Sequence, residues 1–140
     1  MEEKILCPID FSESSIKALK YAIKLAKKEH LGVTVLFSYR LIQPGRGEEI
    51  LSFRDKMEEA ARERFDVLEK FFDNGVKTDH EFLVEIGFFS DCIARQVRNK
   101  KVRKIVIDNH MHEIINDLNQ PPESFLNSLP VPVIVIGDEE

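Results

Sequence analysis

A chain of 140 residues is long enough for one domain with a good core and too short for two. Hydrophobic residues make up 43% and charged residues 32%, which excludes a disordered chain. No apolar run approaches the roughly 20 residues that span a bilayer. The net charge of −5 disfavours broad binding to nucleic-acid backbones, which needs clustered Lys and Arg. We expect one domain over residues 1–140, with neither nucleic acid nor membrane as a partner.

The N-terminus and the cysteines are typical of a cytoplasmic protein. Met1 is followed by charged residues and a short apolar stretch, unlike a secretory signal peptide. Cys7 lies in an apolar run and Cys92 near the start of a predicted helix. Both are expected to be small buried side chains rather than disulfide partners or reactive thiols.

The first quarter of the chain predicts a strand, a helix and a second strand. Residues 4–9 form an apolar run typical of a strand buried on both faces, with Pro8 near its end. Ser12 is a suitable N-cap for a helix with apolar residues at helical spacing. Gly32 is the natural C-terminal stop of this helix. Residues 33–39 are rich in strand-favouring residues and predict the second strand.

A long helix and a third strand follow. Residues 48–73 predict the helix, and residues 77–86 predict the strand by their alternation of apolar side chains. One side of the helix is expected to be buried. Its members are Phe53, Met57, Ala61, Leu68 and Phe72.

The last third of the chain predicts two more strands. Ser90 is the expected N-cap of a third helix, and residues 104–107 predict the fourth strand. The basic cluster at residues 100–104 falls at the predicted end of that helix, where positive charge suits the helix dipole; a nucleic-acid patch is the alternative. Pro121-Pro122 opens a short helix, and residues 131–136 predict the fifth strand.

This alternation predicts an α/β fold: a doubly wound, five-stranded parallel sheet with helices on both faces. In the common order 3-2-1-4-5, strand order reverses between strands one and four, and ligands sit beyond the carboxyl ends of strands at that point. Any small-molecule site should therefore use Asp10 and the segment 108–120.

Three segments together resemble universal stress proteins. Residues 5–15, read as Ile-Leu-Cys-Pro-Ile-Asp-Phe-Ser-Glu-Ser-Ser, resemble the family's opening strand and turn. Residues 84–87 resemble the end of its third strand, and residues 128–136 its closing Pro-x-Pro turn and last strand. The resemblance covers essentially the whole chain and implies the same fold.

One branch of this family binds ATP through a glycine-rich segment after strand four. Here Asp108 and Met111 stand where the first two glycines belong, and Asn119-Gln120 where a Gly-Ser pair belongs. A carboxylate about 4 Å from a phosphate costs on the order of 4 kcal/mol at an effective dielectric near 20. We therefore predict no tight ATP binding and no cofactor.

The alternative function is a nucleotide-binding universal stress protein that uses an altered loop, and a different small ligand is also left open. Asp10 matches the acidic residue that contacts the nucleotide in the ATP-binding branch, although capping the turn after strand one is the alternative role. Candidate ligand-binding residues are Ile9, Asp10, Asp108, Asn109, His110, Asn119 and Gln120.

Two catalytic alternatives use the same segment. His110 and His112, with Asp108 and Glu113, have the side chains of a zinc site, but a site needs three or four converging ligands. Ser12 with His110 and Asp10 has the side chains of a hydrolase, but no nucleophile elbow is present. We expect neither metal nor catalysis.

The fifth strand is the expected site of self-association. In the order 3-2-1-4-5 it is an edge strand, and an apolar edge favours pairing with a second copy. Universal stress proteins often dimerise through this strand, so the predicted interface is Val131, Val133 and Val135. Alternatively, a loop or the acidic residues 138–140 cover the edge. The leading expectation is a non-enzymatic homodimer that acts by protein association, with unknown protein partners.

Overall fold

The computed structural model describes residues 3–39, 47–72, 79–99, 101–111 and 129–137. Strands and helices alternate along most of the chain. The elements are β1 (Lys4–Pro8), α1 (Glu13–Glu29), β2 (Gly32–Tyr39), α2 (Gly47–Phe72), β3 (His80–Ile86), α3 (Phe89–Asn99), β4 (Val102–Asp108) and β5 (Val133–Ile136). The predicted helix at Pro121-Pro122 lies outside the described residues.

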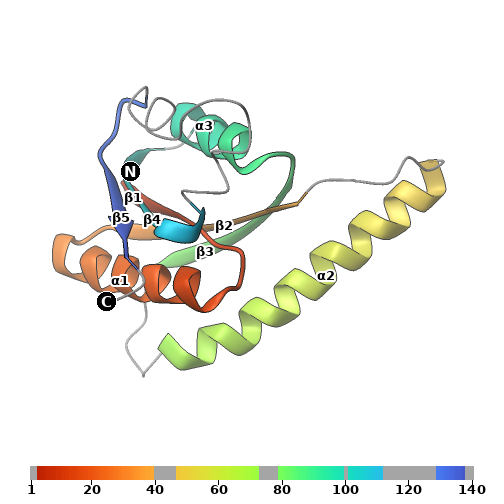
Figure 1. Ribbon diagram of the computed structural model, residues 1–140, viewed down its shortest axis with the longest axis horizontal. Helices are drawn as coiled ribbons and strands as arrows, with labels where there is room; N and C mark the ends of the chain where they lie inside the picture. Colours follow the sequence, from red (N-terminus) through yellow and green to blue (C-terminus); the bar gives the residue numbers. More distant parts are fainter. Residues whose placement is uncertain (1–2, 40–46, 73–78, 100, 112–128, 138–140) are drawn as a thin grey trace.

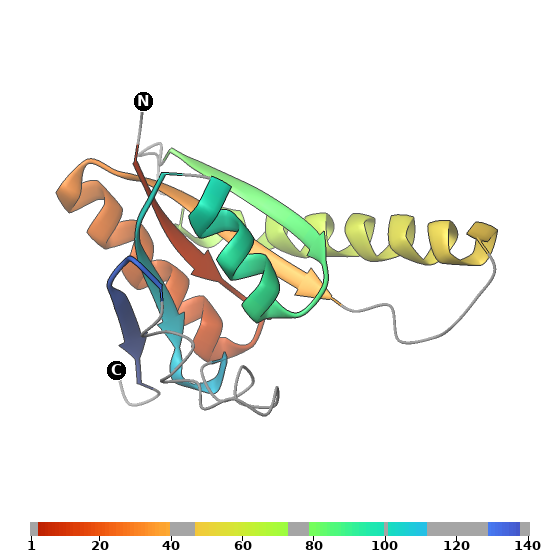
Figure 2. The same cartoon turned by 90° about the horizontal axis from the view of Figure 1, so that it is seen from above.

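All five strands pair in parallel in the order β3-β2-β1-β4-β5. Helices α1 and α2 lie on one face of the sheet and α3 lies on the other (Figures 1 and 2). The predicted fold class and strand order are therefore confirmed. Strands β1 and β4 are neighbours, so their carboxyl ends meet at one edge, where the topology predicted a site.

Side chains of the central strand alternate between two cores. Ile5, Cys7 and Ile9 pack into the core beneath α1 and α2, whereas Leu6 packs into the core beneath α3. Each face of the sheet is thus sealed by its own layer of helices, as expected for a strand buried on both sides. Pro8 is the last residue of β1, where its missing N–H does no harm to the sheet.

The end of α1 differs from the prediction. His30, rather than Gly32, adopts the left-handed conformation after the last turn, with φ 60°, and Leu31 N–H donates to Ala26 O at 2.8 Å. Gly32 is instead the first residue of β2. A Cβ atom at Gly32 would lie 3.1 Å from Asp79 Oδ2, so the glycine permits a close approach between neighbouring chain segments.

The start of α3 also differs. The helix begins at Phe89, and Cys92 N–H donates to Phe88 O at 3.0 Å, so Ser90 lies within the first turn and is not the N-cap. Strand β4 begins at Val102, two residues earlier than predicted. Within the basic cluster, Arg103 and Lys104 therefore lie on β4 and not at the end of α3.

Two side chains of that cluster form ion pairs across the surface. Arg103 Nη1 lies 2.7 Å from Glu3 Oε2, and Lys104 Nζ lies 2.8 Å from Glu29 Oε1. Acidic side chains thus neutralise part of the charge that a nucleic-acid surface would need.

Helix α2 buries only part of its apolar stripe. Ala61, Phe65 and Leu68 are buried, but Phe53 is 44% exposed. Much of the first half of α2 extends beyond the sheet (Figure 1), and Phe53 lies beside Tyr39, the last residue of β2. The prediction that Phe53 is buried was wrong for this reason, and the side chain of Phe72 is not among those described.

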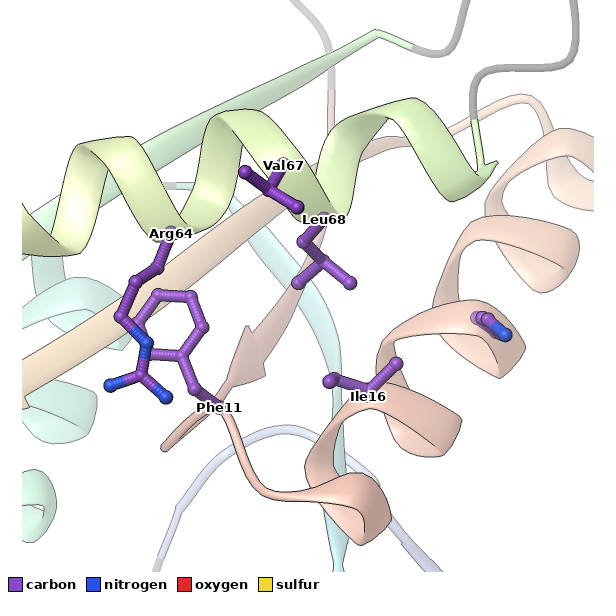
Figure 3. Close-up of a pocket in the computed structure, with 6 residues that line it drawn as sticks. Phe11, Ile16, Arg64, Val67 and Leu68 are labelled. Atoms are coloured by element: carbon purple, nitrogen blue, oxygen red, sulfur yellow. The ribbon is translucent and has the colours of Figure 1, made fainter.

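Phe11, in the turn between β1 and α1, contacts both β2 and α2. Phe11 has a positive φ of 64°, and its ring centre lies 5.2 Å from that of Phe37. The guanidinium carbon of Arg64, on α2, lies 4.4 Å from the centre of the Phe11 ring (Figure 3). Phe11 therefore links the end of β1 to α2 and lies at the border between α1 and α2.

Candidate functional site

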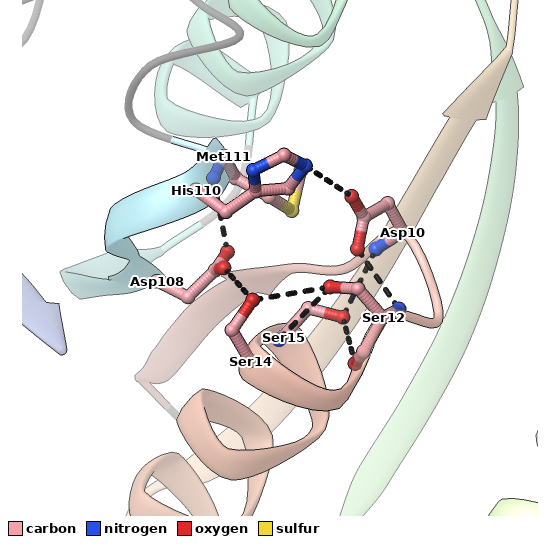
Figure 4. A network of polar contacts seen from close by, with 7 residues as sticks. All are labelled: Asp10, Ser12, Ser14, Ser15, Asp108, His110 and Met111. Atoms are coloured by element: carbon pink, nitrogen blue, oxygen red, sulfur yellow. Dashed lines mark hydrogen bonds and ion pairs between the residues drawn. The ribbon is translucent and has the colours of Figure 1, made fainter. Parts of the chain in front are cut away.

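Asp10 and Ser12 shape the turn that leaves β1. Asp10 Oδ1 accepts a hydrogen bond from Ser12 N–H at 3.0 Å, and Ser12 Oγ accepts one from Ser15 N–H at 3.2 Å (Figure 4). Ser12 has extended backbone angles and is the N-cap of α1, as predicted. Asp10 thus performs the alternative role foreseen for it, closing the turn with its carboxylate.

Asp108, the last residue of β4, turns its carboxyl group into the protein. Ser14 Oγ donates to Asp108 Oδ2 at 2.6 Å, and Met111 N–H donates to Asp108 Oδ1 at 3.3 Å (Figure 4). Asp108 is fully buried. Both carboxyl oxygens are therefore used to join β4 to the first turn of α1 and to the turn that follows β4.

Met111 and Ile9 are also fully buried. Met111 packs into the core beneath α3, together with Leu6, Leu36 and Ile107. Where the ATP-binding branch has its second glycine, a thioether side chain thus fills the interior. Ile9 belongs to the opposite core, and its N–H donates to Leu36 O at 2.8 Å. The side chains of these two residues face the interior and do not line a surface.

The exposed part of the site consists of Asp10, Asn109 and His110. His110 Nε2 lies 3.9 Å from Asp10 Oδ2, and the His110 side chain is 54% exposed. Burial raises the pKa of Asp10, but hydrogen bonds from Ser12 and Ser15 and the charge of His110 outweigh it, so the pKa lies below its ordinary value. The pair therefore presents an anionic oxygen and an imidazole to the surface.

The remaining site predictions have separate outcomes. Asn119 and Gln120, like His112, lie outside the described residues. In the part of the chain that the structure describes, no three His, Cys, Asp or Glu side chains converge as metal ligands would. Ser12 Oγ lies 3.3 Å from Ser14 Oγ, and no hydrogen bond among these same ranges joins it to His110.

Both thiols are buried and free, as predicted. Burial raises the pKa of Cys92 to about 11 and that of Cys7 further still. A thiol with so high a pKa holds little thiolate at neutral pH, which excludes a ready nucleophile at either position.

Sequence reasoning named Leu68 as buried but missed the groove beside it, between α1 and α2. A groove there is bordered by Phe11, Ile16, Lys20, Arg64, Val67 and Leu68. Phe11 had been considered only as part of the opening motif. A signal for the others was present, because Lys20 and Arg64 lack acidic residues at the neighbouring helical positions.

Comparisons with known proteins agree with the fold. A model of the universal stress protein family matches residues 1–137. Three solved structures resemble the chain over nearly its whole length. They are the hypothetical protein MJ0577 (TM-score 0.77, 21% identity, 100% of this chain and 99% of that one), a universal stress protein family member from Burkholderia pseudomallei (0.68, 24%, 96% and 96%), and the universal stress protein from Archaeoglobus fulgidus in complex with dAMP (0.62, 16%, 97% and 98%).

A comparison with curated protein sequences found no match. Of the helices within the described ranges, none is both long and apolar enough to cross a membrane.

Proposed function

Because the chain belongs to the universal stress protein family, we propose that it is a non-enzymatic member that acts through protein association. In this proposal the protein is a homodimer paired along β5, does not bind ATP tightly, and works in the cytoplasm. Free thiols such as those of Cys7 and Cys92 stay reduced in that compartment.

The buried carboxyl group of Asp108 is the observation that supports the absence of ATP binding. Phosphate sites at the switch point of such sheets use free N–H groups and glycines that let the backbone approach. Here the hydroxyl of Ser14 and the N–H of Met111 already donate to Asp108. A phosphate in this place would have to displace a satisfied, buried carboxyl group, and two residues with side chains replace the glycines.

The edge strands of the sheet support the dimer. Strand β3, at one edge, carries charged residues that include Glu81 and Glu85, both in ion pairs. Strand β5, at the other edge, is Val-Ile-Val-Ile, and its Val135 is 43% exposed. An uncharged edge with unpaired backbone groups favours addition of a strand from a second copy, whereas charge on an edge opposes it.

The predicted interface needs one adjustment. Strand β5 begins at Val133, so Val131 precedes it. Val131 and Val133 are partly buried against the core beneath α3 of their own chain. Val135 is therefore the side chain best placed to contact a partner.

Titration calorimetry with ATP and Mg²⁺ tests the proposed absence of tight ATP binding. We expect no heat of binding and no rise in melting temperature up to millimolar ATP. Mg²⁺ with sulfate at equal ionic strength is the control for salt effects. A micromolar dissociation constant for ATP would contradict the proposal.

Sedimentation at micromolar concentrations tests the proposed homodimer. The wild-type protein should sediment as a dimer, and Val135→Lys should sediment as a monomer because it places charge on the pairing edge. Ile86→Lys is the matched control, because Ile86 is 38% exposed and lies at the end of the opposite edge strand. A monomeric wild type, or equal loss of the dimer in both variants, would refute pairing through β5.

A second candidate is binding of a nucleoside monophosphate. The Archaeoglobus fulgidus protein was solved with dAMP, and the Asp10–His110 pair remains at the surface here. Titration with dAMP, followed by NMR, should shift the His110 ring resonances under this reading. His110→Ala should then weaken binding, whereas no shift at millimolar dAMP would eliminate it.

A further inference from the structure

The groove between α1 and α2 has the size of a small-molecule site. Its volume is about 380 Å³, and small-molecule sites span about 300–1,000 Å³. Of its bordering residues, Phe11 follows β1, Ile16 lies on α1, and Arg64, Val67 and Leu68 lie on α2 (Figure 3). The groove therefore depends on both helices and differs from the Asp10–His110 site.

The walls of the groove are mainly apolar. Leu68 is buried at its base, and Phe11 and Ile16 are partly buried along its side. Val67 is 57% exposed, and Figure 3 shows it on the turn of α2 beside Leu68. Water in such a groove contacts mostly carbon, so an aliphatic or aromatic group that replaced it would bind favourably.

Two cations border this apolar surface, Lys20 on α1 and Arg64 on α2. Neither forms an ion pair with any residue in the described ranges. Helical neighbours of Arg64 at three and four positions are Ala60, Ala61, Val67 and Leu68, and those of Lys20 are Ile16, Lys17, Ile23 and Lys24. No acidic side chain is thus placed by either helix to neutralise them, in a protein whose net charge is −5.

Arg62 shows the contrast within the same helix. Its neighbours at three and four positions include Glu58, Glu59 and Asp66. Arg62 forms no ion pair within the described ranges either, but it has three acidic residues within about one helical turn, and Arg64 has none at these positions. The positive charge beside the groove is therefore a local feature and not a general property of α2.

Arg64 is held in a position suited to an anion. Its guanidinium carbon lies 4.4 Å from the centre of the Phe11 ring, which is within the range of a cation–π interaction. A cation–π contact uses none of the N–H donors of a guanidinium in a hydrogen bond, so they can still pair with the two oxygens of a carboxylate. The left-handed backbone of Phe11, a sparsely populated conformation for a bulky residue, holds the ring beneath it.

The geometry points to a binding site for a small amphipathic carboxylate of the medium-chain fatty acid class. Its carboxylate pairs with Arg64, with Lys20 adding positive charge, and its tail lies along Phe11, Ile16 and Val67. This assignment is independent of the proposed dimer and of the absence of ATP binding, because it uses neither β5 nor Asp108.

Titration calorimetry with decanoate, below the concentration at which it forms micelles, tests the site. Each fully buried methylene contributes about fourfold in affinity, so decanoate should bind several-fold more tightly than octanoate in an open groove. Decanol, which has the same chain and no charge, should bind at least about tenfold more weakly, as expected for loss of a charge-assisted hydrogen bond. Arg64→Gln should weaken decanoate binding by a similar factor.

Matched variants separate a specific site from general attraction. Arg62→Gln removes the same charge two residues away and should leave decanoate affinity unchanged. Val67→Glu places a carboxylate in the groove and should abolish binding. Because Arg64 and Val67 are exposed, Arg64→Gln and Val67→Glu should melt within a few degrees of the wild type.

Three outcomes with decanoate and its analogue would overturn the assignment. They are the absence of decanoate binding at any concentration below micelle formation, equal affinity for decanol, and equal weakening by Arg62→Gln and Arg64→Gln. Binding of a Glu-rich peptide in place of decanoate would also overturn it, since it would identify the groove as a protein-docking surface.

Discussion

Asp108 is a structural link between β4 and its neighbours. It ends β4 and is fully buried, with one oxygen bonded to Ser14 and the other to the N–H of Met111. A buried carboxyl group without partners would be costly, so these donors are as much a part of the core as the apolar residues around them.

Ser14→Ala should therefore lower the free energy of unfolding by about 1–3 kcal/mol, because it leaves a buried carboxyl oxygen without its donor. Urea unfolding followed by circular dichroism measures this change. Ser52→Ala is the control, since Ser52 is exposed on α2 and should change stability by less than about 0.5 kcal/mol. Equal stability of Ser14→Ala and the wild type would show that the bond contributes nothing.

Asp10 should make stability depend on pH. Its pKa in the folded protein lies below the ordinary value of 3.8, so the ionised form favours the fold. This contribution is complete above the ordinary value and is lost as pH falls through the lowered pKa. Asp10→Asn should cost about 1 kcal/mol at pH 7, and the difference from wild type should shrink in acid.

Urea unfolding of both proteins between neutral pH and about pH 2 measures this difference, across the range where carboxylates titrate. A difference that stays constant over the whole range would mean that Asp10 acts through its shape rather than its charge.

Helix α2 shows that an apolar stripe is buried only where another element lies beneath it. Phe65 packs against Phe82 of β3 with ring centres 4.4 Å apart, and Glu69 Oε2 lies 2.5 Å from His80 Nε2. The ring centre of Phe53, three turns earlier on the same stripe, lies 6.4 Å from that of Tyr39, the last residue of β2. The periodicity identified the stripe but not the length of sheet that covers it.

Phe65→Ala should therefore cost about 3–5 kcal/mol, the usual result of removing a buried phenyl ring. Phe53→Ala, on the exposed part of the stripe, should cost less than about 1 kcal/mol. Thermal and urea unfolding compare the two. Similar losses in both variants would mean that the first half of α2 is packed against something in solution, such as a second copy.

The boundaries of elements were less predictable than their order. Ser90 looked like an N-cap, but α3 begins one residue earlier, at Phe89. Gly87, with φ 138°, precedes this start. Gly32 looked like a helix stop, but it begins β2, where a Cβ atom would lie only 3.1 Å from the side chain of Asp79, a residue distant in sequence. Local residue preferences cannot include such tertiary contacts.

At the scale of the molecule, one sheet separates two cores. Ile5 and Leu6 are adjacent and fully buried, yet they belong to different cores, beneath α1 and α2 and beneath α3 respectively. Because β1 lies in the middle of the sheet, neither core can lose its packing without disturbing the strand that both share.

Ile5→Ala and Leu6→Ala should each lower the free energy of unfolding by about 2–5 kcal/mol. Both variants should still unfold in one cooperative transition, with the denaturant slope of the wild type. Circular dichroism and hydrogen exchange of β4 amides would test this. A separate early transition in only one variant would show that the two cores unfold independently.

The parallel sheet followed from the alternation of elements, since parallel strands joined by helices leave few topologies. The strand order followed from the common order of such sheets, and the structure has that order. The sequence also placed Asp10 and His110 together, and the structure brings them within 3.9 Å. It could not show that Asp108 faces inward. That orientation depends on Ser14, whose hydroxyl is brought to β4 only when α1 packs on the sheet.

Asp108 has one more consequence, which concerns competition. It is tethered to β4 beside the first turn of α1, so its local effective concentration is high and does not vary with the solution. A dissolved anion must compete with this internal acceptor and also lose its freedom of movement on binding. If the chain does not bind ATP tightly, as we propose, the first turn of α1 should stay bonded to Asp108 whether cellular nucleotide is abundant or scarce.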